Sequence, residues 1–194
     1  MTDSELVARA LAGSEDAFRT LVLRYQRPVY GLIVRMVRER ELAEDLSQEV
    51  FLKAYRALDS YDPTRKFSSW LFKISHNATI DHLRRSEVST VPLDGDSDGE
   101  LGVARILEDE TEATPERRLL GSDLGQELDV ALRSLRPAYR EAILLRHREE
   151  LSYQEIAEVT GASLGTVKTN LHRARKELAE ILRRRGLLRP GEGA

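Results

Sequence analysis

The sequence predicts an all-α protein made of two small helical domains joined by a flexible acidic linker. Apolar residues recur at helical spacing through both ends of the chain, and no segment shows the alternation of a strand. A segment rich in turn residues and acids separates the two ends. We therefore divide the 194 residues into a first domain (1–87), the linker (88–122), a second domain (123–186) and a short tail (187–194).

Helical periodicity divides the first domain into five stretches, at about 3–12, 15–25, 28–37, 42–58 and 67–86. Ser14 follows Gly13 and is placed to cap the second stretch. Pro28 suits the first turn of a helix, where a missing N–H costs nothing, so the third stretch is expected to begin there. Asp62 and Pro63 predict a turn before the last helix.

The second domain has the sharper pattern. A helix over 124–135 is followed by one that starts at Pro137. Ser152 and Glu155 have the spacing of a capping box, in which each side chain accepts a hydrogen bond from the other's backbone N–H. The short helix that they begin ends in a tight turn at 161–163, and Ser163 caps a long helix over about 164–184. A helix, a short turn that contains glycine and a longer second helix together form the helix-turn-helix arrangement.

The long helix separates two faces. Val167, Leu171, Ala174 and Leu178 fall on the side expected to pack against the preceding helix. The other side carries hydrogen-bonding and cationic side chains that suit base edges and phosphates: Lys168, Thr169, His172, Arg173 and Lys176. Arg175 and Arg183 to Arg185 are expected at the DNA backbone. The alternative interpretation is a solvated basic helix whose terminal arginines complement the helix dipole.

Charge and cysteine content restrict the function classes. The net charge of −3 argues against avid DNA binding by the chain alone, but residues 168–189 hold eight basic and two acidic side chains. The absence of cysteine excludes disulfides and a cysteine nucleophile and fits a reducing cytoplasm. An acidic N-terminus without an apolar run predicts neither a secretory signal nor membrane insertion.

Three patterns that imitate other chemistry carry little weight. Residues 161–165 fit G-x-S-x-G, but a helix is expected before them, where a hydrolase has a strand. Residues 94–99 imitate the start of a calcium loop, but Arg105 stands where the bidentate glutamate belongs. The four histidines lack zinc-site spacing, and no phosphate-binding loop is present. We expect no cofactor, metal, small-molecule substrate or catalytic residue.

Two blocks of sequence resemble the extracytoplasmic-function (ECF) sigma factors of bacterial RNA polymerase. The block in the first domain consists of three segments, DLSQEVFLKAYR (45–56), FSSWLFKISHN (67–77) and DHLRR (81–85). In the second they are LSYQEIA (151–157) and GTVK (165–168), and the resemblance spans about residues 3–184. It implies a factor that binds the polymerase core and directs it to promoters by reading the minus-ten and minus-thirty-five elements. It also implies an anti-sigma factor as partner.

The resemblance assigns roles to individual residues. Asp45, Gln48 and Glu49 match the face that docks the clamp coiled coil of the largest polymerase subunit. Asn77 matches the pocket for a base flipped out of the minus-ten element, and the loop 61–66 matches the segment near the opened strand. Further contacts with minus-ten DNA are expected from Trp70, Lys73, Arg84 and Arg85. The five exposed residues of the long helix match positions that read the minus-thirty-five element, and the acidic linker would thread polymerase channels.

Other interpretations remain open at each site. The three polar residues from Asp45 to Glu49 also fit a solvated face beside buried Leu46 and Val50, and Asn77 also fits a local hydrogen bond. The spacing of Trp70 with Leu71 and Ile74 favours core packing over base stacking. For the whole chain, the alternatives are a dimeric helix-turn-helix regulator that binds operators without polymerase, and a protein that only sequesters a partner.

Overall fold

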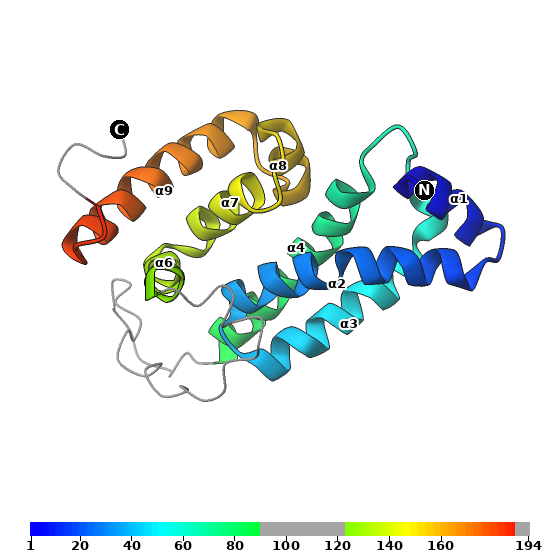
Figure 1. Cartoon of the computed structure of the whole chain (residues 1–194), viewed down its shortest axis with the longest axis horizontal. Helices are drawn as coiled ribbons and strands as arrows, with labels where there is room; N and C mark the ends of the chain where they lie inside the picture. Colours follow the sequence, from blue (N-terminus) through cyan, green and yellow to red (C-terminus); the bar gives the residue numbers. More distant parts are fainter. Residues whose placement is uncertain (90–122, 189–194) are drawn as a thin grey trace.

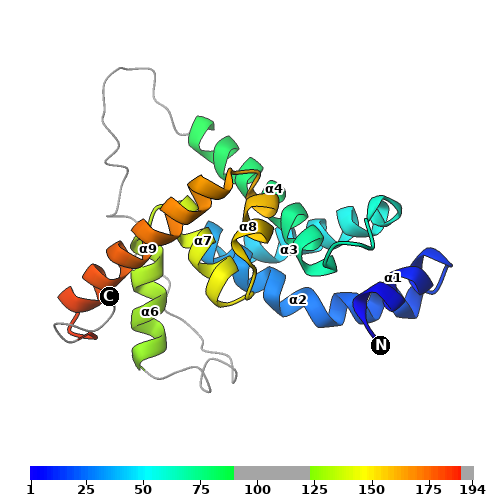
Figure 2. The same cartoon turned by 90° about the horizontal axis from the view of Figure 1, so that it is seen from above.

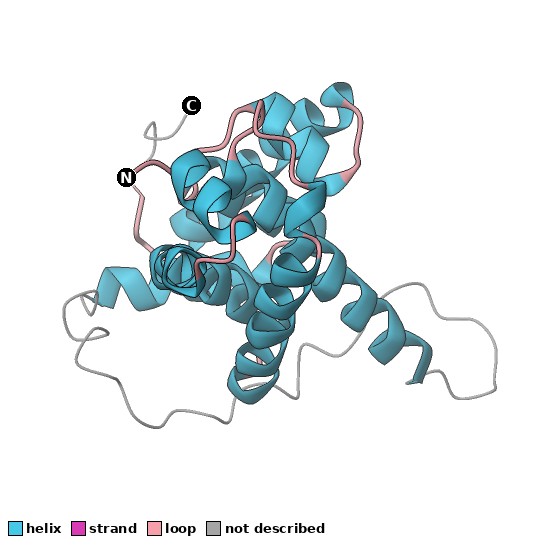
Figure 3. Ribbon diagram, turned by 90° about the vertical axis from the view of Figure 1, so that its right-hand side faces the viewer, coloured by secondary structure: helices cyan, strands magenta, loops and turns pink. Residues whose placement is uncertain are grey.

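The computed structural model describes residues 1–89 and 123–188, and over these ranges its elements are helices joined by loops (Figures 1 and 3). Eight α-helices and one 3-10 helix occur within the described residues, without a strand. The prediction of an all-α protein is therefore confirmed. Nearly all of the predicted acidic linker and most of the predicted tail lie outside the described residues.

The first half of the structure is a helical bundle. It consists of α1 (Asp3–Leu11), α2 (Glu15–Val37), α3 (Arg40–Arg56), the 3-10 helix η1 (Leu58–Ser60) and α4 (Phe67–Ser89). Helices α2, α3 and α4 pack against one another, and α1 packs on α2. The core is made of side chains at helical spacing, among them Leu21, Ile33, Val50 and Leu71, each at most 1% exposed.

The prediction that a helix begins at Pro28 is wrong, because α2 is one helix of 23 residues with Pro28 inside it. An internal proline removes one backbone hydrogen bond and costs roughly 3 kcal/mol. The apolar stripe continues on both sides of the proline, with Leu21 before it and Val29, Leu32 and Ile33 after it, all buried. Burial of both halves of the stripe in one core outweighs the local cost.

The second half contains α6 (Asp123–Ser134), α7 (Pro137–His147), α8 (Tyr153–Thr160) and α9 (Leu164–Arg184). Both bonds of the predicted capping box are present: Glu155 N donates to Ser152 Oγ at 3.2 Å, and Ser152 N donates to Glu155 Oε2 at 2.7 Å. Helix α8 ends at Gly161, whose φ of 69° is left-handed and costs glycine little. Ser163 accepts a hydrogen bond from Thr166 N and caps α9, as predicted.

The two halves lie against each other. Helix α8 packs on α4, and α6 and α7 pack on the C-terminal part of α2 (Figures 1 and 2). Buried apolar residues of both halves belong to one contiguous cluster. The sequence suggested two domains on a tether and gave no expectation of this contact. No helix of the described residues is long and apolar enough to cross a bilayer.

Candidate nucleic-acid interface

Helix α9 presents the predicted reading face to solvent. Its inner side is buried, with Val167, Leu171 and Ala174 at most 2% exposed. All five predicted contact residues are exposed: Lys168, Thr169, His172, Arg173 and Lys176. Thr169 Oγ1 donates to Gly165 O at 3.0 Å, so its lone pairs are left to accept from a base or a bridging water. The face thus offers three cationic donors, an imidazole and one hydroxyl acceptor, from Lys168, Arg173, Lys176, His172 and Thr169 respectively.

Beside this face, Arg175 joins α9 to the last residue of α7 and the first residue of α8. Its guanidinium nitrogens lie 3.4 Å from both His147 Nε2 and Tyr153 Oη. Burial, followed by the charges of Arg175 and Arg146, lowers the pKa of His147 below its ordinary value of 6.5. His147 is therefore neutral at pH 7 and can accept from Arg175. Arg175, which is expected at the DNA backbone, is thus held in place by α7 and α8.

Helix α3 carries the predicted polymerase face. Asp45, Gln48 and Glu49 are exposed, whereas Leu46 and Val50 on the opposite side are buried. Glu49 Oε1 lies 2.6 Å from Lys53 Nζ, one turn further along the helix. The arrangement is open to a protein partner and equally suits a solvated acidic face, so the role of these residues stays a prediction.

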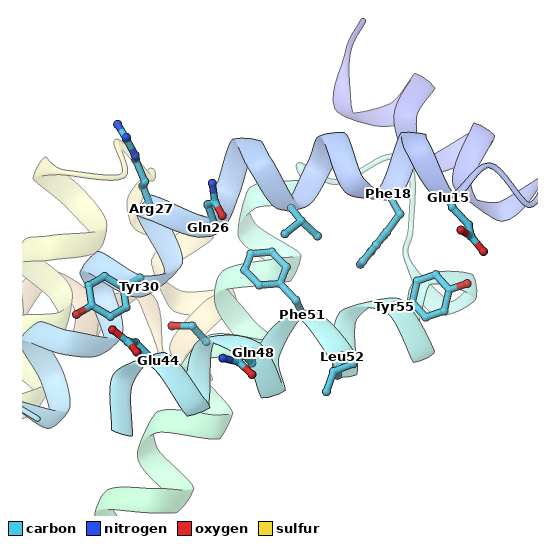
Figure 4. Close-up of a pocket in the computed structure, with 12 residues that line it drawn as sticks. Glu15, Phe18, Gln26, Arg27, Tyr30, Glu44, Gln48, Phe51, Leu52 and Tyr55 are labelled. Atoms are coloured by element: carbon cyan, nitrogen blue, oxygen red, sulfur yellow. The ribbon is translucent and has the colours of Figure 1, made fainter. Parts of the chain in front are cut away.

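A groove of about 970 Å³ lies between α2 and α3 and adjoins this face at Gln48. Phe18 of α2 and Phe51 and Tyr55 of α3 lie along it (Figure 4), and the rings of Phe18 and Tyr55 meet edge to face at 4.9 Å. Leu52 and Tyr55 remain 57% and 54% exposed. Exposed apolar side chains that are concentrated in this way mark a surface suited to a protein partner.

The predicted minus-ten residues lie on α4. Asn77, Lys73, Arg84 and Arg85 are exposed, and Trp70 is half-buried. The indole of Trp70 is centred 5.6 Å from the ring of Tyr61 and 5.5 Å from that of Phe67. Such a cluster holds Trp70 in the fold, as its spacing favoured, and leaves part of its ring accessible.

The loop 61–66 precedes α4 and holds two cations that contact the other half of the molecule. Its turn is set by Asp62, whose Oδ1 accepts from Thr64 N at 2.9 Å. Arg65 Nη1 lies 3.0 Å from Glu158 Oε2, and Lys66 Nζ lies 2.9 Å from Glu155 Oε1, both acids of α8. Burial alone would raise the pKa of Glu155, but hydrogen bonds from Lys66 and Ser152 lower it. The carboxylate of Glu155 is therefore ionised at pH 7.

Sequence reasoning missed a polar contact that joins the halves at α7. Arg140 is 1% exposed and donates to five carbonyl oxygens, two of which belong to α2. The neighbouring residue, Glu141, contacts α4: its Oε1 lies 2.6 Å from Nδ1 of His76. The available signal was the continuous apolar run 142–145, since a helix buried on several sides requires partners for its charged residues.

Two of the patterns set aside on sequence can be checked in the described residues. Residues 161–165 follow helix α8 and not a strand, and the Oγ of Ser163 accepts a capping hydrogen bond. No group of three or more histidine or acidic side chains that could hold a metal ion occurs in the described part of the chain. The calcium-like residues 94–99 lie outside the described residues.

Comparison with protein families finds two matches in the expected order. The Sigma-70 region 2 family matches residues 21–88, and the Sigma-70, region 4 family matches residues 125–178. The ECF RNA polymerase sigma factor SigW of Bacillus subtilis (strain 168) is 36% identical over 172 residues, which are 88% of this chain and 91% of SigW. The ECF RNA polymerase sigma-E factor of Escherichia coli (strain K12) is 36% identical over 185 residues, covering 92% of this chain and 93% of the relative.

Solved structures show the same fold. CnrH, in complex with the cytosolic domain of CnrY, superposes with a TM-score of 0.67 at 26% identity, over 94% of this chain and 97% of the CnrH chain. The sigma factor RpoE of Bartonella quintana, in complex with the anti-sigma factor NepR, gives a TM-score of 0.64 at 24% identity, over 88% of this chain and 98% of that one.

Proposed function

From the premise that the chain belongs to the sigma-70 family, as one of its ECF sigma factors, we propose which surfaces carry each part of the work. As an alternative sigma factor, the protein directs RNA polymerase to specific promoters. The first half (1–87) is the region 2 domain, and the second half (123–186) is the region 4 domain. The segment 88–122 joins them as a linker through the polymerase.

Region 4 reads the minus-thirty-five element through α9. Lys168, Thr169, His172, Arg173 and Lys176 supply the contacts with bases and phosphates in the major groove. The observation that carries this assignment is the division of α9 into a buried inner side and an outer side on which all five residues are exposed. The net charge of −3 keeps free duplex DNA a weak ligand, so that selection depends on the polymerase complex.

Region 2 binds the polymerase and opens the minus-ten element. Asp45, Gln48 and Glu49 dock the clamp coiled coil from the exposed face of α3. On α4, Asn77 holds a flipped base, and Lys73, Arg84, Arg85 and the accessible part of Trp70 contact the strand. The catalytic chemistry of RNA synthesis belongs to the polymerase, and the sigma factor has no enzymatic role of its own. We place it in the cytoplasm, where the polymerase works.

A second protein partner is an anti-sigma factor. Support comes from CnrH, which was solved with the cytosolic domain of CnrY and shares this fold, and from the apolar groove beside the polymerase face. The competing function, a stand-alone dimeric regulator, would need only the helix-turn-helix half. The match of residues 21–88 to sigma region 2 favours the sigma factor.

The test is reconstituted transcription with core polymerase from the source bacterium and a library of upstream DNA fragments. Defined start sites that depend on the protein support the proposal. Asp45→Ala should weaken co-elution with core, whereas Asp59→Ala, which removes another exposed acid, should not. Arg173→Ala should weaken promoter selection with core binding intact, and Arg19→Ala serves as its control. Loss of core binding in Arg173→Ala would contradict the division of labour.

A further inference from the structure

We propose that the first turn of α9 reads one base of the minus-thirty-five element by apolar contact: Leu164 packs on the C5-methyl group of a thymine, and Gly165 lets the turn come close enough to do so. The inference deepens the proposed function and rests on it. It adds an apolar contact to the polar and cationic side chains of this surface. The ligand is identified by its chemistry, as the base whose edge presents a methyl group in the major groove.

Leu164 is the first residue of α9, and 38% of it is exposed. Val167 and Leu171, three and seven residues further on, belong to the buried side of the helix and are at most 2% exposed. Leu164 therefore lies at the edge of the buried side, where the fold holds part of the side chain and part of it faces outward. A single exposed leucine is common on protein surfaces, so its position decides what it can do.

This position adjoins the proposed reading face. Lys168 and His172 follow Leu164 at intervals of four residues, so the three side chains form one row along the helix, and all three are exposed. In a helix-turn-helix, the N-terminal residues of the second helix contact the base edges. Helical side chains also lean towards the N-terminus, which extends Leu164 towards the bases. The row thus begins with an apolar side chain at the end of the helix that enters the groove.

The polar side chains of the same turn are engaged with each other. Ser163 Oγ accepts a hydrogen bond from Thr166 N at 3.1 Å and lies 2.9 Å from Thr166 Oγ1. Both hydroxyls are therefore held at the cap of the helix. Leu164 and Gly165 stand between these two residues, so Leu164 carries the only other side chain of the turn.

Gly165 is not required by the fold itself. Its backbone is helical, without the left-handed φ that favours glycine. Among the described residues, a Cβ built on it would meet only Ser163 Oγ, at 3.7 Å, which is ordinary van der Waals contact. Glycine is a poorer helix former than alanine, so its presence here weakens the helix. A glycine that the protein does not need for its own packing indicates close approach of a ligand to the backbone.

Thymine is the base that this surface fits. In the major groove thymine presents a C5-methyl group that cytosine lacks, and the other bases present hydrogen-bond donors and acceptors. Leucine cannot pair with those polar groups, so leucine placed against them would remove their water without replacing it. Burial of one methyl group against Leu164 should strengthen binding about fourfold.

The test uses the full chain with core polymerase on a promoter identified by reconstituted transcription. Deoxyuridine replaces each thymine of the minus-thirty-five element in turn, on either strand, which removes one methyl group and keeps every hydrogen-bonding group. We expect one such replacement to weaken binding by the parent holoenzyme about fourfold. Leu164→Ala should bind the thymine and deoxyuridine promoters equally. Leu128→Ala is the matched control, because Leu128 of α6 is similarly exposed, at 40%, and the variant should keep the difference.

Gly165→Ala tests the close approach separately. It should raise the urea midpoint of unfolding, because alanine is the better helix former and has room for its methyl group. It should also weaken promoter binding by at least about fourfold, since the added methyl group holds the turn, and Leu164 with it, away from the groove. A purely structural role for Gly165 would not lower binding while stability rises. Unchanged promoter binding by Gly165→Ala would overturn the close approach.

The outcomes separate this inference from the proposed function. A holoenzyme that selects a minus-thirty-five element and is insensitive to every deoxyuridine replacement overturns the thymine contact alone. An equal loss on deoxyuridine in the parent and in Leu164→Ala does the same, as does a selected element without an A·T pair. A holoenzyme that shows no promoter selection refutes the proposed function, and the inference falls with it.

Discussion

Replacing Arg140 tests whether its five hydrogen bonds hold the fold as their geometry indicates. Arg140→Met keeps the length and apolar stem of the side chain and removes every donor. Five carbonyls then lose this donor, two of them in the other half of the molecule. Leu132 O keeps the N–H of Leu135 and Arg133 O keeps the guanidinium of Arg38. Burial, followed by the charges of Arg38 and Arg133, lowers the pKa of Arg140 to about 10, so the group that is lost is a cation at pH 7.

The magnitude follows from two opposing effects. Each hydrogen bond to a charged group contributes roughly 1.5–3 kcal/mol, but methionine also avoids the cost of burying a charge. A buried carbonyl left without a donor costs roughly 1–3 kcal/mol. We therefore expect Arg140→Met to lower the free energy of unfolding by about 4 kcal/mol, a large share of the roughly 5–15 kcal/mol that holds a domain together.

Urea denaturation followed by far-ultraviolet circular dichroism measures this change. Arg140→Lys is the graded control, because an ammonium has three donors and can satisfy at most three of the five carbonyls. Its loss should be intermediate, at about half that of Arg140→Met. A loss below about 1 kcal/mol in Arg140→Met would show that water or rearrangement satisfies the carbonyls, and the reasoning from their geometry would be refuted.

Three further predictions concern region 4 and the whole chain. Ser152→Ala removes the capping box of α8 and should lower the free energy of unfolding by about 1 kcal/mol, measured by the same titration, with Ser134→Ala as control. The pKa of His147 is lower in the folded state than its ordinary 6.5, so the unfolded chain takes up the proton first and stability should fall as the pH drops below about 6.5. His147→Gln should lose this part of the pH dependence, and an identical melting profile in both would contradict the assignment. The free chain should bind random duplex DNA weakly, and nanomolar binding that is insensitive to salt would contradict the role given to its negative charge.

Local signals in the sequence predicted most of the local structure, although Ser14, at the N-cap position of α2, makes no side-chain capping hydrogen bond. The cap at Ser163 and the capping box of α8 depend on side chains three residues apart, so their spacing alone determines them. Pro28 misled the prediction because the local rule for proline says nothing about the core that both ends of α2 enter. For Trp70, spacing favoured packing, and its ring contacts with Tyr61 and Phe67 agree.

The contact between the halves could not be predicted, since its partners carry no sequence signature. Arg140 reaches the carbonyl of Arg35, 105 residues away, and every residue has a carbonyl. The exposed candidate residues, such as Asn77 and Arg173, could be placed by helical periodicity. Their roles depend on what they bind, which neither periodicity nor burial specifies.

Because Arg140 donates to main-chain oxygens, its hydrogen bonds do not depend on which side chains the accepting residues carry. A substitution at Arg35 or Met36 changes a side chain and leaves the acceptor in place, provided that α2 still ends at the same turn. Descendants of this chain could diverge at the last turn of α2 without losing the contact, whereas any substitution of Arg140 weakens it. Among related sequences that keep this contact, we expect arginine at the equivalent position and varied residues at the ends of the two helices that it joins.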